Sequence, residues 1–376
     1  MSARQRIVII GFGDTGLLVA AHLKKRYEIV AISPKPLMVS GQELGTRLAR
    51  PQFWQDLYML GFDRYKALQG VEIVHGKALS LNLADQLVIS ELSDGTMRED
   101  EYDALVIATG TQNGFWRTPH IETQEQIEKA IAHQARLCRE AQHIAIIGGG
   151  PSGVSAAANL KQTYPDKQVD LYFSRAEALP DYHPKTRAQI MAELAALDVG
   201  LHPHHRAKRP ARMNHLALTQ GQVDFETGQD KIQADLVLWT IGARKPNSQF
   251  LPPELLTPDG FVRTNAFLQC PEATGVFAIG DIADTDPNRS SARNAGFLIL
   301  AKNIQAYLAN KPHKMKKFSA PRHRWGSVLG VQKTGMSIYS PQGKRFHLSQ
   351  WWVLKMLFPI FVWRLIYRGV SKVKRH

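Results

Sequence analysis

The most regular hydrophobic pattern in the chain is a short apolar run that ends in glycines and is followed by helical spacing. It occurs at residues 6–23, RIVIIGFGDTGLLVAAHL, and again at residues 143–160, HIAIIGGGPSGVSAAANL. Each copy predicts a buried strand, a tight turn and the start of a helix. A second strand follows each helix, at YEIVAIS (27–33) and QVDLYFS (168–174). The repetition predicts an α/β fold with two doubly wound units.

The glycines of each turn have separable physical roles. Gly11 permits the tight turn, Gly13 lets the backbone approach a pyrophosphate, and Gly16 lets helix and strand pack closely. The same spacing recurs at Gly148, Gly150 and Gly153. Since unpaired N–H groups and the positive dipole end lie at a helix N-terminus, both turns predict dinucleotide sites.

Three further apolar strands end in small or acidic residues: YDALVIATGTQ (102–112), ADLVLWTIGARKPN (234–247) and TGVFAIGDIAD (274–284). With these motifs in this order, residues 6–310 resemble the pyridine-nucleotide-dependent flavoprotein oxidoreductases with two dinucleotide-binding domains. The resemblance implies two Rossmann-like domains, with the NAD(P) domain inserted in the FAD domain. The expected boundaries are 1–115 and 244–310 for the FAD domain, 116–243 for the NAD(P) domain, and 311–376 for a C-terminal region.

The resemblance also implies which residues bind the cofactors. Asp281 is expected to accept a hydrogen bond from a ribitol hydroxyl of FAD. The implied FAD contacts are Gly11, Gly13, Asp14, Thr15, Gly16, Ser33, Lys35, Ala78, Thr109, Gly110, Gly280 and Asp281. The implied NADH or NADPH contacts are Gly148, Gly150, Pro151, Ser152, Gly153, Ser174, Arg175 and Gly242.

Three stretches narrow the resemblance: GQELGTRLARPQFW (41–54), TYPDKQVDLYFS (163–174) and VFAIGDIAD (276–284). They are similar to the branch of type II NADH:quinone oxidoreductases and ferroptosis suppressor (apoptosis-inducing-factor-like) proteins. The branch implies electron transfer from NAD(P)H through FAD to a quinone. Cys138 and Cys270 are the only cysteines and form no C-x-x-C or metal-ligand spacing, which excludes a dithiol relay and favours a reducing, cytoplasmic environment.

The sequence departs from its relatives at three positions. Ser33 stands where most relatives carry the acid that binds the adenosine ribose. In the second unit, Phe173 is followed by Ser174 and Arg175; a guanidinium without a competing carboxylate favours NADPH, while a solvated Arg175 leaves NADH open. Ser155 replaces a glutamate expected near the hydride path, which leaves a slow-turnover, redox-sensing role as an alternative.

Residues 290–308, SSARNAGFLILAKNIQAYL, have helical apolar spacing after two serines. They predict a capped helix whose N-terminus points at the flavin ring. A helix that only packs on the sheet explains the same pattern.

The C-terminal tail, residues 350–376, is rich in aromatic and aliphatic residues and ends in basic ones. Its apolar run from Trp351 to Tyr367 contains Lys355, Arg364 and a central Pro359, so it is too short and too charged for a typical span. We expect it to lie in a membrane interface, which places the protein peripherally on the cytoplasmic face of a membrane. A dimer-forming or core-packing helix pair broken at Pro359, and a true span, are the alternatives.

The chain has 47 Lys and Arg against 33 Asp and Glu, a net charge of +14. The histidine-rich basic stretch 200–215, GLHPHHRAKRPARMNH, predicts a solvated loop, with electrostatic steering of membrane or substrate, or a metal site, as lesser alternatives. The charge also suits a soluble reductase of a small acidic iron–sulfur carrier. Nucleic-acid recognition motifs are lacking, and the strand directly after MSARQR predicts no signal peptide.

Overall fold

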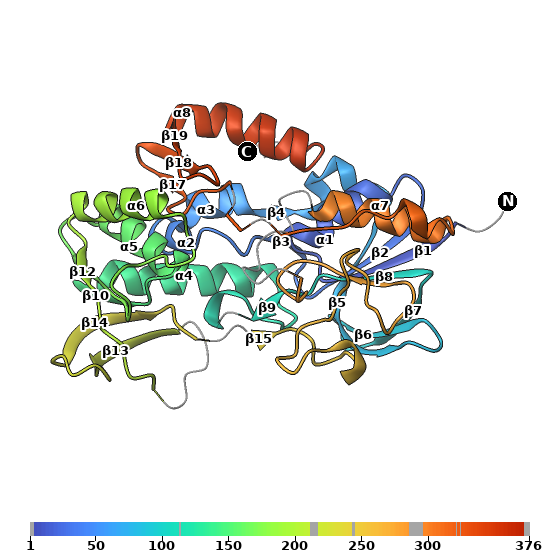
Figure 1. Ribbon diagram of the computed structural model, residues 1–376, viewed down its shortest axis with the longest axis horizontal. Helices are drawn as coiled ribbons and strands as arrows, with labels where there is room; N and C mark the ends of the chain where they lie inside the picture. The colour runs from blue at the N-terminus through green and yellow to red at the C-terminus, as the bar shows by residue number, and fades with distance from the viewer. Residues whose placement is uncertain are drawn as a thin grey trace.

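A computed structural model describes residues 4–112, 114–210, 217–242, 245–285, 296–320, 322–323 and 325–371. Two sheet-centred halves lie next to each other along the long axis of the molecule, and a C-terminal helix lies across one side (Figure 1). Each half is built around one of the two glycine turns.

The first half contains a seven-stranded sheet with the order β16-β8-β1-β2-β5-β6-β7. Strands β1, β2, β8 and β16 are parallel and almost wholly apolar, because helices and loops bury both faces. The strand bounds are β1 (Arg6–Ile10), β2 (Glu28–Ser33), β5 (Glu72–Asn82), β6 (Leu87–Leu92), β7 (Met97–Glu101), β8 (Ala104–Ile107) and β16 (Val276–Ala278). Since β16 lies in the same sheet as the N-terminal strands, the chain returns to this half after building the other.

The second half contains a five-stranded sheet with the order β12-β11-β10-β14-β13. Its strands are β10 (His143–Ile147), β11 (Gln168–Tyr172), β12 (Gly200–His202), β13 (Ala217–Val223) and β14 (Ile232–Trp239). Two short antiparallel strands, β9 (Thr111–Gln112) and β15 (Lys245–Pro246), pair where the chain leaves and re-enters the first half. This arrangement is the inserted α/β fold that the motifs predict.

The helices cover the two sheets and join them. Their bounds are α1 (Asp14–Leu23), α2 (Leu44–Ala49), α3 (Pro51–Tyr58), α4 (Gln124–Glu140), α5 (Pro151–Thr163), α6 (Pro184–Ala196) and α7 (Gly296–Leu308). Single 3₁₀ turns are η1 (Phe62–Arg64), η2 (Lys66–Leu68), η3 (Gly114–Trp116), η4 (Pro253–Leu255) and η6 (Pro312–Lys314). Helix α4 begins with a full capping box, in which Thr123 and Gln126 bond reciprocally.

The C-terminal region starts with a small antiparallel sheet and ends in a helix. Strands β17 (Val331–Gln332), β18 (Gly335–Tyr339) and β19 (Arg345–Ser349) lead into α8 (Gln350–Trp352) and η7 (Val353–Ile366). The antiparallel strands β3 (Leu37–Val39) and β4 (Met59–Gly61), with α2 and α3 between them in the sequence, lie below this helix in Figure 1. We call α8 and η7 together the C-terminal helix.

The C-terminal helix runs through Pro359 without a break. Its Tyr367 N–H bonds the carbonyl of Val362, the wider i to i−5 spacing of a π-type helix. The break at Pro359 in the alternative of a core-packing helix pair is therefore wrong, although the helix does pack partly against the core, as that alternative proposed. Among the described residues, no helix has both the length and the apolar character needed to cross a bilayer.

Candidate functional site

The first glycine turn is tightly packed at Gly11 and Gly16, and it has free space at Gly13. Gly11 has φ +93°, and a Cβ there would lie 2.5 Å from the Ala108 carbonyl oxygen. A Cβ on Gly16 would lie 2.2 Å from the Gly11 oxygen, so helix α1 packs directly on the turn. A Cβ on Gly13 would meet nothing within 4 Å, which leaves open space where a diphosphate would approach.

The second glycine turn repeats this geometry. Gly148 has φ +126°, and a Cβ on Gly153 would lie 2.0 Å from the Gly148 oxygen. A Cβ on Gly150 would meet nothing within 4 Å. Helix α5 then starts at Pro151, followed by Ser152.

Both helix N-termini are available for anions. No described side chain caps the first N–H groups of α1 or α5, so these groups and the helix dipoles face the open side of each turn. The residues present therefore fit two dinucleotide diphosphates, as the spacing predicts.

The segments that cross between the halves meet beside the first turn. Thr109 Oγ1 donates to the Asn247 carbonyl (2.8 Å), Asn247 Nδ2 donates to the Thr109 carbonyl (2.9 Å), and the Asn247 N–H bonds the Gly110 carbonyl (3.1 Å). Gly242, with φ +126°, follows β14 on the way back from the second half. Thr109, Gly110 and Gly242 thus lie in the segments that connect the two halves.

Gly280 and Asp281 come back to the first turn from the far end of the chain. A Cβ on Gly280 would lie 3.5 Å from Thr15 Oγ1 at the start of α1. The Asp281 carboxylate forms an ion pair with Arg117, 2.9 Å from Nη1. Arg117 also donates to the Gly41 carbonyl, and no sequence motif pointed to Arg117.

Ser33 ends β2, Lys35 follows it, and Ala78 lies in the neighbouring strand β5. Ser33 Oγ bonds the Lys35 backbone (2.8 Å to the carbonyl), while the Lys35 ammonium contacts Glu122 and donates to Thr118 Oγ1 at 2.9 Å. Burial, followed by Arg47, lowers the pKa of Lys35 to about 8. Ala78 is buried in β5, opposite Ser90. Their contacts with the adenosine end of FAD stay a prediction.

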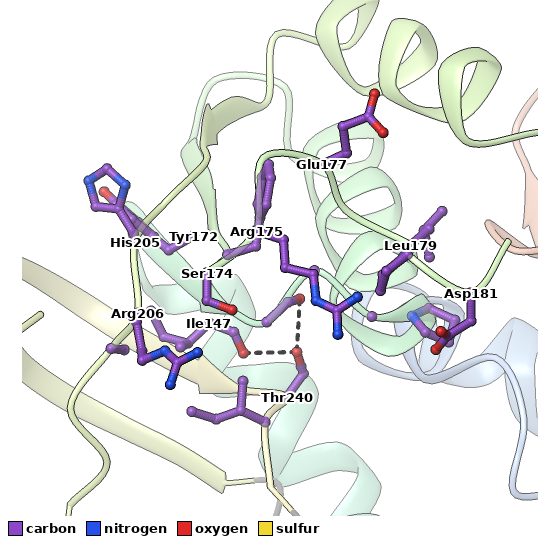
Figure 2. A pocket seen from close by; sticks show the side chains of 18 of the residues that line it. Ile147, Tyr172, Ser174, Arg175, Glu177, Leu179, Asp181, His205, Arg206 and Thr240 are labelled. Atoms are coloured by element: carbon purple, nitrogen blue, oxygen red, sulfur yellow. Dashed lines mark hydrogen bonds between the residues drawn. The ribbon is translucent and has the colours of Figure 1, made fainter. Parts of the chain in front are cut away.

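A pocket of about 610 Å³ opens at the second glycine turn (Figure 2). Gly148, Gly150 and Pro151 form one wall, with Thr240 bonding the carbonyls of Ile147 (2.9 Å) and Gly148 (3.2 Å). Around them lie Gly149, Tyr172, Phe173, Ser174, Arg175, Glu177, Leu179, Pro180, Asp181, Tyr182, His205, Arg206, Ala207, Arg209, Glu226 and Ile241. The sequence-predicted residues Ser174 and Arg175 therefore share one pocket with the second turn.

The basic loop after β12 contributes to this pocket. Its cations Arg206, Lys208 and Arg209 are exposed, as a solvated loop predicts. Arg206 and Arg209 line the pocket together with Arg175. In Figure 2 the side chain of Arg206 lies on one side of Ser174 and that of Arg175 on the other, extending toward Leu179 and Asp181, while Glu177 points away. Glu177 is paired with Arg187 at 2.6 Å. The three arginines form the cationic part of the pocket wall, which also contains the carboxylates Asp181 and Glu226.

His202, from the same stretch, lies partly exposed on the edge strand β12 of the second half. Its ring stacks on Tyr172, with centroids 4.3 Å apart. The Asp170 carboxylate contacts His143 Nε2 at 2.8 Å and His202 Nε2 at 3.1 Å. Burial opposes ionisation of Asp170, but bonds from His202, Gln168 and His143 lower its pKa overall. His215 lies outside the described residues.

Ser155 is buried on the face of α5 that packs on α2. A Cβ on Gly45 of α2 would lie 2.2 Å from the Ser155 carbonyl oxygen. That oxygen accepts a bond from Asn159 Nδ2 (2.9 Å), which also donates to the Leu329 carbonyl (2.8 Å). Ser155 thus lies where α5, α2 and the C-terminal region join.

Helix α7 is described from Gly296 onward. Ser290 and Ser291, the expected cap, lie outside the described residues. From Gly296 the helix packs on α1, with Phe297 and His22 rings 5.2 Å apart. Its direction toward a flavin stays a prediction.

The C-terminal helix has one buried and one exposed apolar face. Val353 and Phe358 are buried against a cluster that contains Trp54 and Tyr58, and the Tyr58 and Phe358 rings meet edge to face at 5.5 Å. The exposed apolar side chains, 40% to 60% accessible, are Trp351, Trp352, Ile360, Phe361 and Leu365.

Comparison with known proteins agrees with this geometry. The family model for pyridine nucleotide-disulphide oxidoreductases matches residues 5–297. Oxidoreductase ptaL of Pestalotiopsis fici is 26% identical over 352 residues, covering 87% of this chain and 89% of that protein. Ferroptosis suppressor protein 1 of Xenopus tropicalis is 25% identical over 320 residues, covering 83% of each.

Solved structures share the architecture. NDH2 of Plasmodium falciparum has a TM-score of 0.71 and 13% identity, covering 97% of both chains. At this identity, the likeness establishes a common fold.

Proposed function

The chain belongs to the pyridine nucleotide-disulphide oxidoreductase family, and from that premise we propose that it passes electrons from NAD(P)H to a lipid quinone at a membrane surface. Its cofactors are FAD and NADH or NADPH. When bound, FAD supplies the two-electron chemistry. The chain's own residues bind and orient the cofactors and compensate their charge.

Each residue set has a distinct task in this proposal. The N–H groups that follow Gly13 would hold the FAD diphosphate, and Asp281, positioned by Arg117, would hold its ribitol. The turn at Gly150 would hold the diphosphate of the nicotinamide dinucleotide. The hydrogen bonds of Asn247 at the junction hold the two halves together and so set the distance between the two dinucleotide sites.

The cysteines take no part in electron transfer. Cys138 and Cys270 are both buried, in separate apolar clusters. Burial raises the pKa of each thiol to about 12. Electrons must therefore pass from flavin to the acceptor without a disulfide relay.

The exposed face of the C-terminal helix is the observation that carries the acceptor proposal. Five large apolar side chains lie on it beside the exposed cations Lys355, Arg364 and Arg368. Tryptophans and cations around an apolar surface are typical of segments that lie in a membrane interface. A long-tailed quinone is confined to the bilayer, so an enzyme seated by this helix could reach it. We propose a peripheral position on the cytoplasmic face.

The pocket wall favours NADPH over NADH. Arg175, Arg206 and Arg209 come from two separate loops and line the same pocket. A guanidinium can bond a phosphate through two N–H groups. We propose that this wall binds the 2′-phosphate of NADPH.

A double substitution on the exposed face tests the membrane proposal. Phe361→Glu with Leu365→Glu removes two apolar side chains from the contact, so vesicle flotation should weaken at least about tenfold. Turnover with a long-tailed quinone in vesicles should fall in parallel, while turnover with a short, water-soluble quinone stays unchanged. The control is Met97→Glu, at a 57% exposed methionine on β7 of the seven-stranded sheet.

Failure of the parent protein to bind vesicles would contradict the proposal. Efficient, salt-sensitive reduction of an acidic iron–sulfur carrier, unaffected by Phe361→Glu and Leu365→Glu, would favour the soluble-reductase alternative that the net charge of +14 supports.

A further inference from the structure

The end of the chain bonds directly to the first glycine turn. Tyr367 donates its hydroxyl to Asp14 Oδ1 at 2.6 Å, across 353 positions of sequence. Asp14 is the first residue of α1. Its second oxygen, Oδ2, accepts a bond from Ser40 Oγ at 2.9 Å. Hydroxyls from two distant segments therefore hold both oxygens of one carboxylate.

Tyr367 begins the last described segment, residues 367–371, which we call the C-terminal strap. The residues that follow Tyr367 are bonded to the first half. Val370 pairs with Tyr65 in an antiparallel bridge. The Lys66 N–H bonds the Gly369 carbonyl (3.0 Å), and the Ser371 N–H bonds the Arg64 carbonyl (2.9 Å). The tyrosine rings of Tyr65 and Tyr367 meet edge to face at 5.5 Å. The strap is thus fixed on the first half.

A carboxylate at this position has a specific consequence. The uncapped N–H groups at the start of α1 and the positive end of its dipole attract any anion. An unrestrained Asp14 side chain would compete with the FAD diphosphate for them, and its charge would repel the phosphates. Bonds from Tyr367 and Ser40 hold the carboxylate in one place.

We infer that Tyr367 is a positioning residue of the FAD site, which holds the Asp14 carboxylate away from the diphosphate. The C-terminal strap thereby contributes to a site whose other expected residues come from earlier parts of the chain. The inference rests on FAD binding, and it is independent of the proposed quinone and membrane.

FAD affinity of the full chain tests this role. Tyr367→Phe keeps the ring and removes the hydroxyl, and should weaken FAD binding about tenfold or more, since bonds to charged groups are strong. Flavin fluorescence released on dilution gives the dissociation constant. Tyr27→Phe, at a half-buried tyrosine beyond the far end of α1, should leave it unchanged.

Asp14→Asn separates charge positioning from packing. It removes the competing charge, so this variant should bind FAD at least as tightly as the parent. In the Asp14→Asn background, Tyr367→Phe should weaken FAD binding by less than about threefold. Because linkage is reciprocal, FAD should also slow hydrogen exchange of residues 367–371.

Three results would overturn the inference. They are unchanged FAD affinity in Tyr367→Phe, an equally large loss in the Asp14→Asn background, and weaker FAD binding by Asp14→Asn alone. Each is measured without an electron acceptor, so each is distinct from a failure of the quinone proposal.

Discussion

The Arg117 guanidinium and the Asp281 carboxylate lie 2.9 Å apart and join two segments separated by 164 positions. Arg117 follows the first crossing strand, and Asp281 follows β16. Both side chains are mostly buried, with 28% and 22% exposed. This pair places the acid expected to contact the ribitol of FAD.

Arg117→Gln should therefore weaken FAD retention. Loss of one partner from a partly buried ion pair leaves the other charge uncompensated, so FAD affinity should fall about tenfold. The FAD-to-protein ratio after gel filtration measures this. Arg263→Gln removes a more exposed pair, Arg263 with Glu272 at 3.9 Å, and should have no effect; equal FAD content in both variants would contradict the assignment.

The arginines of the pocket should control the choice of nicotinamide cofactor. Arg175→Gln and Arg206→Gln should each raise KM for NADPH about tenfold and leave KM for NADH within about twofold, since only NADPH carries the 2′-phosphate. Steady-state kinetics with both cofactors measure this, with the exposed Arg136→Gln on α4 as control. An equal rise for both cofactors would refute a role in discrimination.

Two glycines of the second turn should respond differently to alanine. Gly150→Ala has space for its Cβ, so the fold should persist while KM for NAD(P)H rises at least about tenfold, because the methyl occupies the diphosphate approach. Gly153→Ala places a Cβ 2.0 Å from the Gly148 oxygen and should lower Tm by several degrees, since overpacking costs about 1–3 kcal/mol. Thermal melts and kinetics on both variants distinguish these effects. The reverse order would be incompatible with the turn geometry.

The thiols should be inert in the folded protein. With pKa values raised to about 12 by burial, Cys138 and Cys270 should react with iodoacetamide at pH 8 only after unfolding. Intact-mass measurement before and after denaturant checks this. Rapid native labelling, or loss of turnover in a variant with both cysteines changed to serine, would contradict electron transfer without thiols.

Local patterns predicted the parts of the site that the backbone builds. The two glycine turns, the crossing strands and Gly280–Asp281 could be located because each is encoded within a few residues by strand, turn and helix signals. Ser174 and Arg175, which line the pocket at the second glycine turn, could be located for the same reason.

Contacts between distant segments could not be predicted in this way. Tyr367 meets Asp14 and Arg117 meets Asp281 only after the chain has folded. Arg206 is exposed, as a solvated loop predicts, but its place at the pocket follows from the pairing of the preceding strand β12 with β11. Pro359 suggested a break, yet one helix continues because its buried side chains pack on α3 and α4.

Anaerobic reduction and reoxidation of the bound flavin test the central claim most directly. NADPH, and more weakly NADH, should bleach the flavin absorption of the purified protein, and vesicles containing a long-tailed quinone should restore it. Recovery should be slower in the Phe361→Glu, Leu365→Glu variant. Absence of flavin, failure of both nucleotides to bleach it, or no recovery with quinone vesicles would contradict the account.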